Sequence, residues 1–196
     1  MDCPLFTQRG TVALPIVYVY ADESCLGNQY RNRARPGAAA GIIEHHSPRQ
    51  GWVRRDFWVS EPDTTNNRMA IRSAILPLAA LKVESRVVFT SDSRYLVDGM
   101  SRWVPNWISR NWTRKSGPIE NLALWQELVG RAALHRVEWR WVRGHAGHPQ
   151  NEYANDLAIR AARDQIASAG LLESSFTDWL EQEQKRGRYL DFVPRG

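Results

Sequence analysis

The pattern of apolar and polar positions divides the chain into short strand-like segments and longer helix-like segments. The apolar positions of 16–22 are nearly continuous, which is typical of a strand covered on both faces. In 135–143, by contrast, Val137, Trp139 and Trp141 occupy every second position, as expected of a strand with one covered face. Strands are predicted at 16–22, 38–46, 51–59, 86–91 and 135–143, and helices at about 66–82, from near 93, at 118–133 and at 149–168.

Residues that start or break helices support this division. Thr64, Thr65 and Asn66 are candidate N-caps of the first long helix, and Pro149 suits the first turn of the last one. Pro77 lies inside the first helix and should bend it, because proline removes a backbone hydrogen bond. The order of strands and helices predicts an α/β fold, with a five-stranded mixed sheet flanked by helices.

Length and composition fit one domain with a short leader and a tail. The chain has 196 residues, of which 43% are apolar and nine are Trp, which is enough for a full core. We expect an N-terminal leader at 1–15, the main domain at 16–168 and a partly helical C-terminal extension at 169–196. In this extension Phe176, Trp179 and Leu180 have helical spacing. The helix either packs on the domain or docks another protein through residues 170–196.

The charge distribution points to an anionic partner. The net charge is +5 and the pI about 9.6, although solubility alone would explain so modest an excess. Between positions 101 and 117 the chain has four cations, three Trp and no acidic residue. This mixture is typical of surfaces that bind nucleic acid.

Nothing in the sequence predicts a secreted or membrane-spanning protein. Cys3 and Cys25 form neither a disulfide framework nor a zinc-binding spacing. The N-terminus lacks the pattern of a signal peptide, and no apolar run reaches the length of a membrane span. We therefore expect a cytoplasmic protein in a reducing setting, and a monomer.

Three aspartates occur where a metal site could form. Asp22 and Asp92 each follow an apolar strand, and Asp156 lies in the last helix, after Gly144-His-Ala-Gly-His-Pro149. Taken singly, two of them need no metal to explain them: Asp92 is a good helix N-cap, and Asp156 could be a solvated helix residue. Asp22 is harder to explain, since a carboxylate that closes an apolar strand is costly unless it is paired or binds a metal.

Together with Thr64-Thr-Asn-Asn-Arg-Met69 and the loop 144–149, the three aspartates resemble type 1 ribonuclease H over about 16–167. The resemblance implies endonucleolytic hydrolysis of the RNA strand of RNA–DNA hybrids with two Mg²⁺ ions, Mn²⁺ being an alternative. Such ions lie roughly 4 Å apart and prefer carboxylate oxygens. It also implies that Asp22, Asp92 and Asp156 are catalytic metal ligands, with Asp22 bridging both ions.

Ala70 is the main departure from the family, which has a catalytic Glu at this position. Either a Glu→Ala change was introduced, or the protein naturally lacks this ligand. The intact remainder of the site favours the introduced change, in which case Ala70→Glu should raise cleavage. Glu23 stands where the family usually has Gly and could be a substitute ligand, but strand alternation should point it away from Asp22. Glu152 lies one turn before Asp156 and would tune the local field.

By the same resemblance, His145 assists proton transfer, because its loop between two glycines gives mobility and its ordinary pKa lies near 7. Contacts to the hybrid should read 2′-hydroxyl groups and groove width rather than base edges. Trp107 is expected in the core rather than in such a contact. The expected substrate-binding residues are Ser24, Asn28, Thr65, Asn66, Asn67, Trp103 and Arg94, the last in place of a Gln common in the family.

Two other functions remain open at this stage. The first is a non-catalytic module that binds RNA–DNA hybrids after losing a metal ligand. The second is another nuclease of the same fold, such as an integrase or resolvase. The histidine loop and the basic Trp-rich segment count against the second function.

Overall fold

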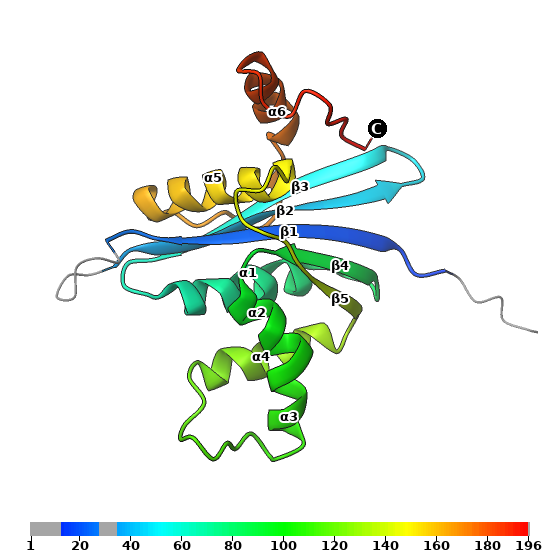
Figure 1. Ribbon diagram of the computed structural model, residues 1–196. Helices are drawn as coiled ribbons and strands as arrows, with labels where there is room; N and C mark the ends of the chain where they lie inside the picture. The colour runs from blue at the N-terminus through cyan, green and yellow to red at the C-terminus, as the bar shows by residue number, and fades with distance from the viewer. Residues whose placement is uncertain (1–12, 28–34, 196) are drawn as a thin grey trace, which may run out of the picture.

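A computed structural model describes residues 13–27 and 35–195. Its strands and helices follow the predicted order (Figure 1). The strands are β1 (Ile16–Cys25), β2 (Gly37–Ser47), β3 (Gly51–Glu61), β4 (Arg86–Ser91), β5 (Arg136–Trp141) and β6 (Leu172–Glu173). The helices are α1 (Asn66–Ala80), α2 (Arg94–Asp98), a π-helical turn η1 (Gly99–Trp103), α3 (Val104–Ile108), α4 (Leu122–Ala132), α5 (Pro149–Asp164) and α6 (Phe176–Lys185).

The strands form one mixed sheet in the order β5-β4-β1-β2-β3-β6. Strand β1 lies near its centre, antiparallel to β2 and parallel to β4. The expected five strands are all present, and the sheet gains a sixth because β6 pairs with β3 through two residues. The predicted α/β architecture is confirmed, with this addition at one edge.

Helices cover both faces of the sheet (Figure 1). On one face Val19 and Ala21 of β1 pack into a core that includes residues of α1 and α4. On the other face Tyr20 packs against a core formed with α5 and α6. Since side chains alternate along a strand, odd-numbered residues of β1 face α1 and even-numbered residues face α5. Asp22 therefore leaves β1 on the α5 side and Glu23 leaves it on the α1 side.

Helix α1 begins at a side-chain cap, as its sequence predicts. The Thr65 hydroxyl accepts a hydrogen bond from the Arg68 backbone N–H at 3.3 Å. Pro77 lies inside the helix and is buried. Ala70 is completely buried in the core between α1 and β1. A longer side chain at position 70 would have to displace core atoms or turn toward the end of β1.

The C-terminal extension packs on the domain. Phe176 and Leu180 of α6 are buried against α5 and β2, and the Tyr153 ring of α5 lies 5.4 Å from both Phe176 and Trp179. The apolar side of this helix is therefore covered by its own chain. Of the two predictions for the extension, this contact favours packing.

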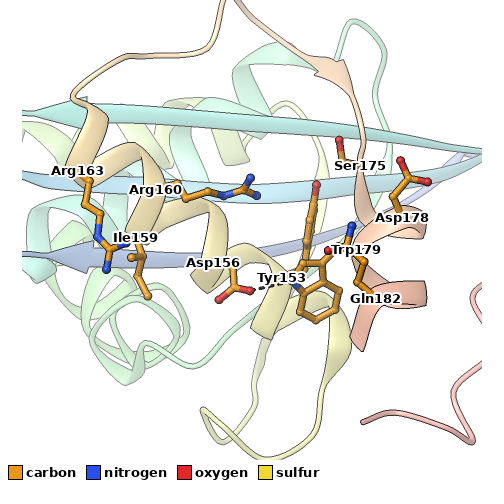
Figure 2. A pocket seen from close by; sticks show the side chains of 9 residues that line it. All are labelled: Tyr153, Asp156, Ile159, Arg160, Arg163, Ser175, Asp178, Trp179 and Gln182. Carbon is orange, nitrogen blue, oxygen red and sulfur yellow. Dashed lines mark hydrogen bonds between the residues drawn. The ribbon is translucent and has the colours of Figure 1, made fainter. Parts of the chain in front are cut away.

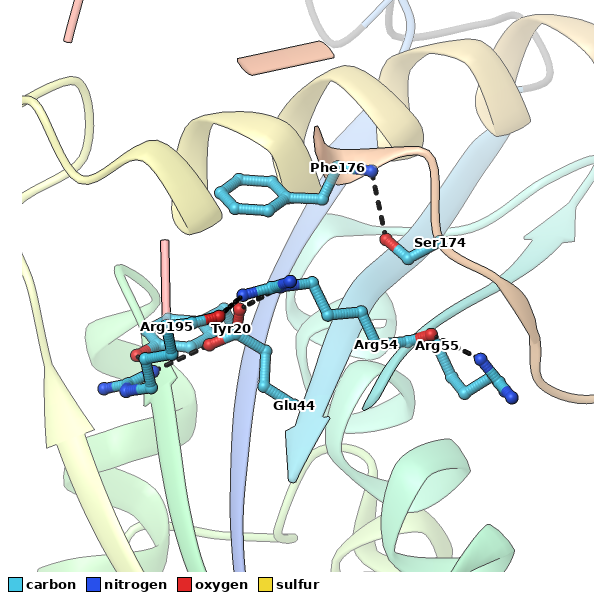
Figure 3. A network of polar contacts seen from close by, with 7 residues as sticks. All are labelled: Tyr20, Glu44, Arg54, Arg55, Ser174, Phe176 and Arg195. Atoms are coloured by element: carbon cyan, nitrogen blue, oxygen red, sulfur yellow. Dashed lines mark hydrogen bonds and ion pairs between the residues drawn. The ribbon is translucent and has the colours of Figure 1, made fainter. Parts of the chain in front are cut away.

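Near the end of the extension, Arg195 contacts strands β1 and β2. The Arg195 guanidinium donates to the fully buried Glu44 carboxylate at 2.7 Å and to the Tyr20 hydroxyl at 3.2 Å (Figure 3). Arg54 donates to the same carboxylate at 2.9 Å. A buried charge needs partners of this kind, because its desolvation is otherwise uncompensated.

Candidate active site

Asp22 and Asp92 meet at the ends of two neighbouring parallel strands. The register pairs Tyr20 with Thr90, so the two aspartates lie side by side just beyond the ladder. Burial raises the pKa of Asp22 to about 8, and the nearby charge of Asp92 adds to this effect. Burial also raises the pKa of Asp92, while the neighbouring His145 opposes the rise. The two carboxylates repel each other when both are ionised, and a bound cation would relieve this repulsion.

Glu23 brings a third carboxylate to the same place. Glu23 as a whole is half-buried. Its Oε2 atom, however, is inaccessible to solvent and has no hydrogen-bond partner within the described part of the chain. Burial, followed by the charges of Asp22 and Asp92, raises the pKa of Glu23 well above its ordinary value, and a hydrogen bond from Ser93 opposes the rise. Glu23 leaves β1 on the face opposite Asp22, as strand alternation predicts, yet its carboxylate lies within electrostatic reach of both aspartates.

Helix α5 closes the site from the other face of the sheet. The Asn151 side-chain amide donates to Asp22 Oδ2 at 3.3 Å. The Glu152 carboxylate accepts from His145 Nδ1 at 3.2 Å, and its charge contributes to the raised pKa values of Asp22 and Asp92. His145 has a φ of 53° and stands in the loop before α5. Asn155 lies one turn after Asn151 on the same side of the helix, so it shares the row that faces Asp22.

Asp156 is not brought to this group. Its Oδ2 accepts a hydrogen bond from the Trp179 indole N–H at 2.8 Å (Figure 2). It lines a cavity of about 570 Å³ between α5 and α6, together with Tyr153 and Arg160. The role of Asp156 as a metal ligand with Asp22 and Asp92 stays a prediction, and Asp156 lies one helical position after Asn155. A step of one residue turns a side chain by about 100° around a helix, and this step points Asp156 toward the C-terminal extension.

Two contacts hold Asp92 that the sequence reasoning missed. The Trp141 indole N–H donates to the Asp92 main-chain carbonyl at 2.9 Å. A Cβ atom at Gly144 would lie 2.3 Å from Asp92 Oδ2, so only glycine leaves room for this carboxylate. The glycine that follows the predicted strand 135–143 was the available signal.

Comparison with known proteins identifies the family to which the chain belongs. A family model for RNase H matches residues 15–163. The chain belongs to the ribonuclease H family. It is 42% identical over 145 residues to a ribonuclease H of Stutzerimonas stutzeri (strain A1501), covering 74% of this chain and 89% of that protein. It is 41% identical over 149 residues to ribonuclease HI of Pseudomonas aeruginosa (strain PAO1), covering 76% and 94%.

A solved ribonuclease H resembles almost the whole chain. The crystal structure of LC9-RNase H1 is 51% identical, covers 94% of each chain and has a TM-score of 0.82. That protein is described as a type 1 RNase H with the type 2 active-site motif. Its coverage, unlike that of the family model, extends beyond α5 and into the C-terminal extension.

The structure describes all but one of the substrate-binding residues predicted from the sequence. Thr65 caps α1, and Asn66 and Asn67 are exposed in its first turn. Ser24 follows Glu23 in β1, and Arg94 begins α2 as an exposed residue two positions after Asp92. Asn28 lies outside the described residues, as does most of the predicted leader.

The basic Trp-rich segment of this ribonuclease H forms η1, α3 and the turn after them. Trp103 is 37% exposed, and its ring lies 6.2 Å from that of the half-buried Trp107. Trp107 in turn contacts the fully buried Trp125. Trp107 thus belongs to the core, as predicted, and Trp103 presents an aromatic surface beside exposed cations.

The carboxylates of Asp22, Glu23 and Asp92 have the chemistry of a site for a divalent cation. Among residues 13–27 and 35–195, no group of three or more His, Cys, Asp or Glu side chains is arranged closely enough to hold an ion. Glu23 nevertheless offers a buried oxygen without a partner, and the pKa values of Asp22 and Asp92 are raised. Mg²⁺ and Mn²⁺ prefer hard oxygen donors such as carboxylates, and a cation would relieve the repulsion between these negative charges.

No helix within the described ranges is long and apolar enough to cross a membrane.

Proposed function

We propose that this protein hydrolyses the RNA strand of RNA–DNA hybrids with two divalent metal ions, and that Asp22, Glu23 and Asp92 supply the carboxylate ligands. The observation that carries the proposal is the Glu23 carboxylate next to the two aspartates, one oxygen of which is buried and has no hydrogen-bond partner among the described residues. A carboxylate in this setting is unfavourable unless a cation or proton joins it. Two metal ions, when bound, activate a water molecule and neutralise charge on the phosphate.

Glu23 offers a natural explanation for Ala70. A third carboxylate entering from β1 makes one from α1 unnecessary, and both positions lie on the α1 side of the sheet. Ala70 is fully buried, so its small side chain fits the space that exists. The 51% identical LC9-RNase H1, whose active-site motif is of type 2, supports a natural rearrangement. We therefore favour a metal ligand that has moved from position 70 to Glu23 over an introduced Glu→Ala change.

The ligand from α5 is Asn155 rather than Asp156. Asn155 shares a helix face with Asn151, which binds Asp22, whereas Asp156 binds Trp179. An amide oxygen is a weaker ligand than a carboxylate but suits a hard cation. Glu152 adds a negative charge near this position without leaving its contact to His145.

His145 is placed to move protons at the edge of the site. Its Nδ1–H is held by Glu152 at 3.2 Å, which leaves Nε2 directed elsewhere on an exposed side chain. An imidazole with one nitrogen held and the other free can take up a proton and pass it on. Its loop position allows it to follow the substrate phosphate and the departing product.

The remaining residues bind and orient the hybrid. Thr65, Asn66 and Asn67 present polar groups and backbone N–H groups at the start of α1, where an anion is favoured. Trp103 and the surrounding cations hold the DNA strand by stacking and charge. We further expect Mg²⁺ to be the working ion, the protein to be monomeric and cytoplasmic, and any protein partner to use the exposed parts of 170–196.

The test is cleavage of a hybrid with a labelled RNA strand in the presence of Mg²⁺, with double-stranded RNA and double-stranded DNA as controls. The unaltered chain should cut the hybrid alone. Glu23→Gln and Asp22→Asn should each lower the rate by about 10²-fold or more, because a misplaced metal misplaces the reacting water. Ala70→Glu should give no gain. Glu23→Ala combined with Ala70→Glu asks whether α1 can take over the ligand.

Each opposite result has a definite meaning. A neutral Glu23→Gln variant together with a large gain from Ala70→Glu would reject Glu23 as a ligand and identify a disabled enzyme. Hybrid binding without cleavage in every variant would favour the non-catalytic binding module.

A further inference from the structure

Trp141 contacts both the backbone of Asp92 and the side chain of Arg94. It is the last residue of β5, it pairs in register with Ser91 of β4, and its side chain is 39% exposed. Its indole N–H donates to the main-chain carbonyl of Asp92 at 2.9 Å. The hydrogen bond fixes the backbone from which the Asp92 carboxylate projects.

The ring of the same residue supports a cation. The Arg94 guanidinium carbon lies 3.8 Å from the centre of the Trp141 ring. None of the ion pairs found among the described residues includes Arg94. Arg94 is exposed, so stacking restrains this guanidinium in place of a carboxylate.

Stacking leaves the guanidinium free to bind an anion. The flat face of the group rests on the ring, while its N–H groups point outward in the plane. Those donors match the oxygens of a phosphate, which they can bind in pairs. Arg94 lies two residues after Asp92, so a phosphate bound there would adjoin the one held at the carboxylates.

We propose that Trp141 is a positioning residue with two tasks: its N–H fixes Asp92, and its ring holds Arg94 against a backbone phosphate of the nucleic acid next to the reacting one. The proposal rests on the proposed function of the acidic site. A plainer role, in which Trp141 only covers the end of the sheet, predicts loss of stability without a specific change in binding or metal dependence.

Two substitutions at Trp141 separate its tasks. Trp141→Phe keeps an aromatic face and loses the N–H, whereas Trp141→Leu loses both. Arg94→Gln removes the cation alone, and Arg131→Gln, at an exposed position of α4, is the matched control for a lost positive charge. Melting curves confirm that each variant is folded.

Binding is measured first, to an RNA–DNA hybrid with metal chelated, over a series of salt concentrations. Arg94→Gln and Trp141→Leu should weaken binding and lower the slope of log K against log salt by about one, the value for one lost phosphate contact. The double variant should bind no more weakly than Trp141→Leu, because the two residues act as a unit. Trp141→Phe and Arg131→Gln should keep the slope of the unaltered protein.

Cleavage is measured second, as kcat and KM over a Mg²⁺ titration. Trp141→Phe should lower kcat severalfold and shift half-saturation to higher Mg²⁺ with KM nearly unchanged, while Arg94→Gln should chiefly raise KM. An unchanged salt slope in Arg94→Gln, or an unchanged kcat and Mg²⁺ dependence in Trp141→Phe, would overturn the corresponding task. The binding assay needs no metal, so it stays decisive even if Glu23 proves not to be a ligand.

Discussion

The contact between Arg195 and Glu44 should make the end of the chain a large contributor to stability. Glu44 is fully buried, and its two charge partners are Arg54 and Arg195 (Figure 3). Arg195 also stacks over Tyr18, with 4.0 Å between the guanidinium carbon and the ring centre. The substitution to make is Arg195→Ala.

The expected magnitude follows from these contacts. A hydrogen bond to a charged group contributes about 1.5–3 kcal/mol, and a partly exposed cation–π contact adds about 0.5–1 kcal/mol. Because Arg54 still partners Glu44 in the variant, we expect a loss of about 2–4 kcal/mol. For a chain of this length, that loss lowers Tm by about 4–16 °C. Glu44→Ala should cost about 3–5 kcal/mol, since it leaves two cations facing an apolar site.

The assay is urea unfolding of both single variants and the double variant. Their double-mutant cycle should give a coupling of about 1–3 kcal/mol at unchanged m. Val193→Ala is the matched control, because Val193 is 83% exposed in the same segment, and it should change stability by less than about 0.5 kcal/mol. If Arg195→Ala behaves like Val193→Ala, or if the two variants are additive, the terminal ion pair contributes nothing and the reasoning fails.

Three further predictions concern the acidic site. With metal chelated, burial raises the pKa of Asp22 from its ordinary 3.8 to about 8, so between these pH values the folded protein keeps a proton that the unfolded chain releases. Tm should therefore fall as pH rises through that interval, and Asp22→Asn should flatten the fall. An equal dependence of Tm on pH in both proteins would refute this prediction. Asp156→Asn should leave hybrid cleavage nearly unchanged while Asn155→Ala lowers it about tenfold or more, and the reverse ranking would restore Asp156 as the ligand. Gly144→Ala should lower kcat strongly with hybrid binding retained, because its Cβ would displace the Asp92 carboxylate; normal kinetics would show that the loop adjusts.

Long periodic segments made most of the fold predictable. Strand β4 was expected at 86–91 and occupies Arg86–Ser91, and the last helix was expected from 149 and begins at Pro149. Strand β6 has only two residues, too few for any alternation to show. Its formation depends on β3, a partner more than a hundred residues away, and such pairing is not encoded in local sequence.

The site was predictable where residues end strands and less so elsewhere. Asp22 and Asp92 were expected in one site because each ends an apolar strand and matches the family's motif, and the structure places these two strands side by side and parallel. The side to which Asp156 points could not be predicted, because one residue of helical phase decides which side of α5 faces the sheet. Glu23 was discounted by strand alternation, which gives the face from which a side chain leaves but not where a long carboxylate ends. The Trp141 contact depends on the approach of β5 to β4, which no spacing along the chain reveals.

The two edges of the sheet avoid open strand pairing by different means. Strand β5 exposes Arg136, Glu138 and Arg140 along its edge, and charged side chains discourage a second molecule from adding a strand there. Strand β3 instead has its backbone groups at Arg55 and Asp56 covered by β6. The C-terminal extension thus shields this part of β3, and losing it would expose backbone groups with which a strand of another molecule could pair.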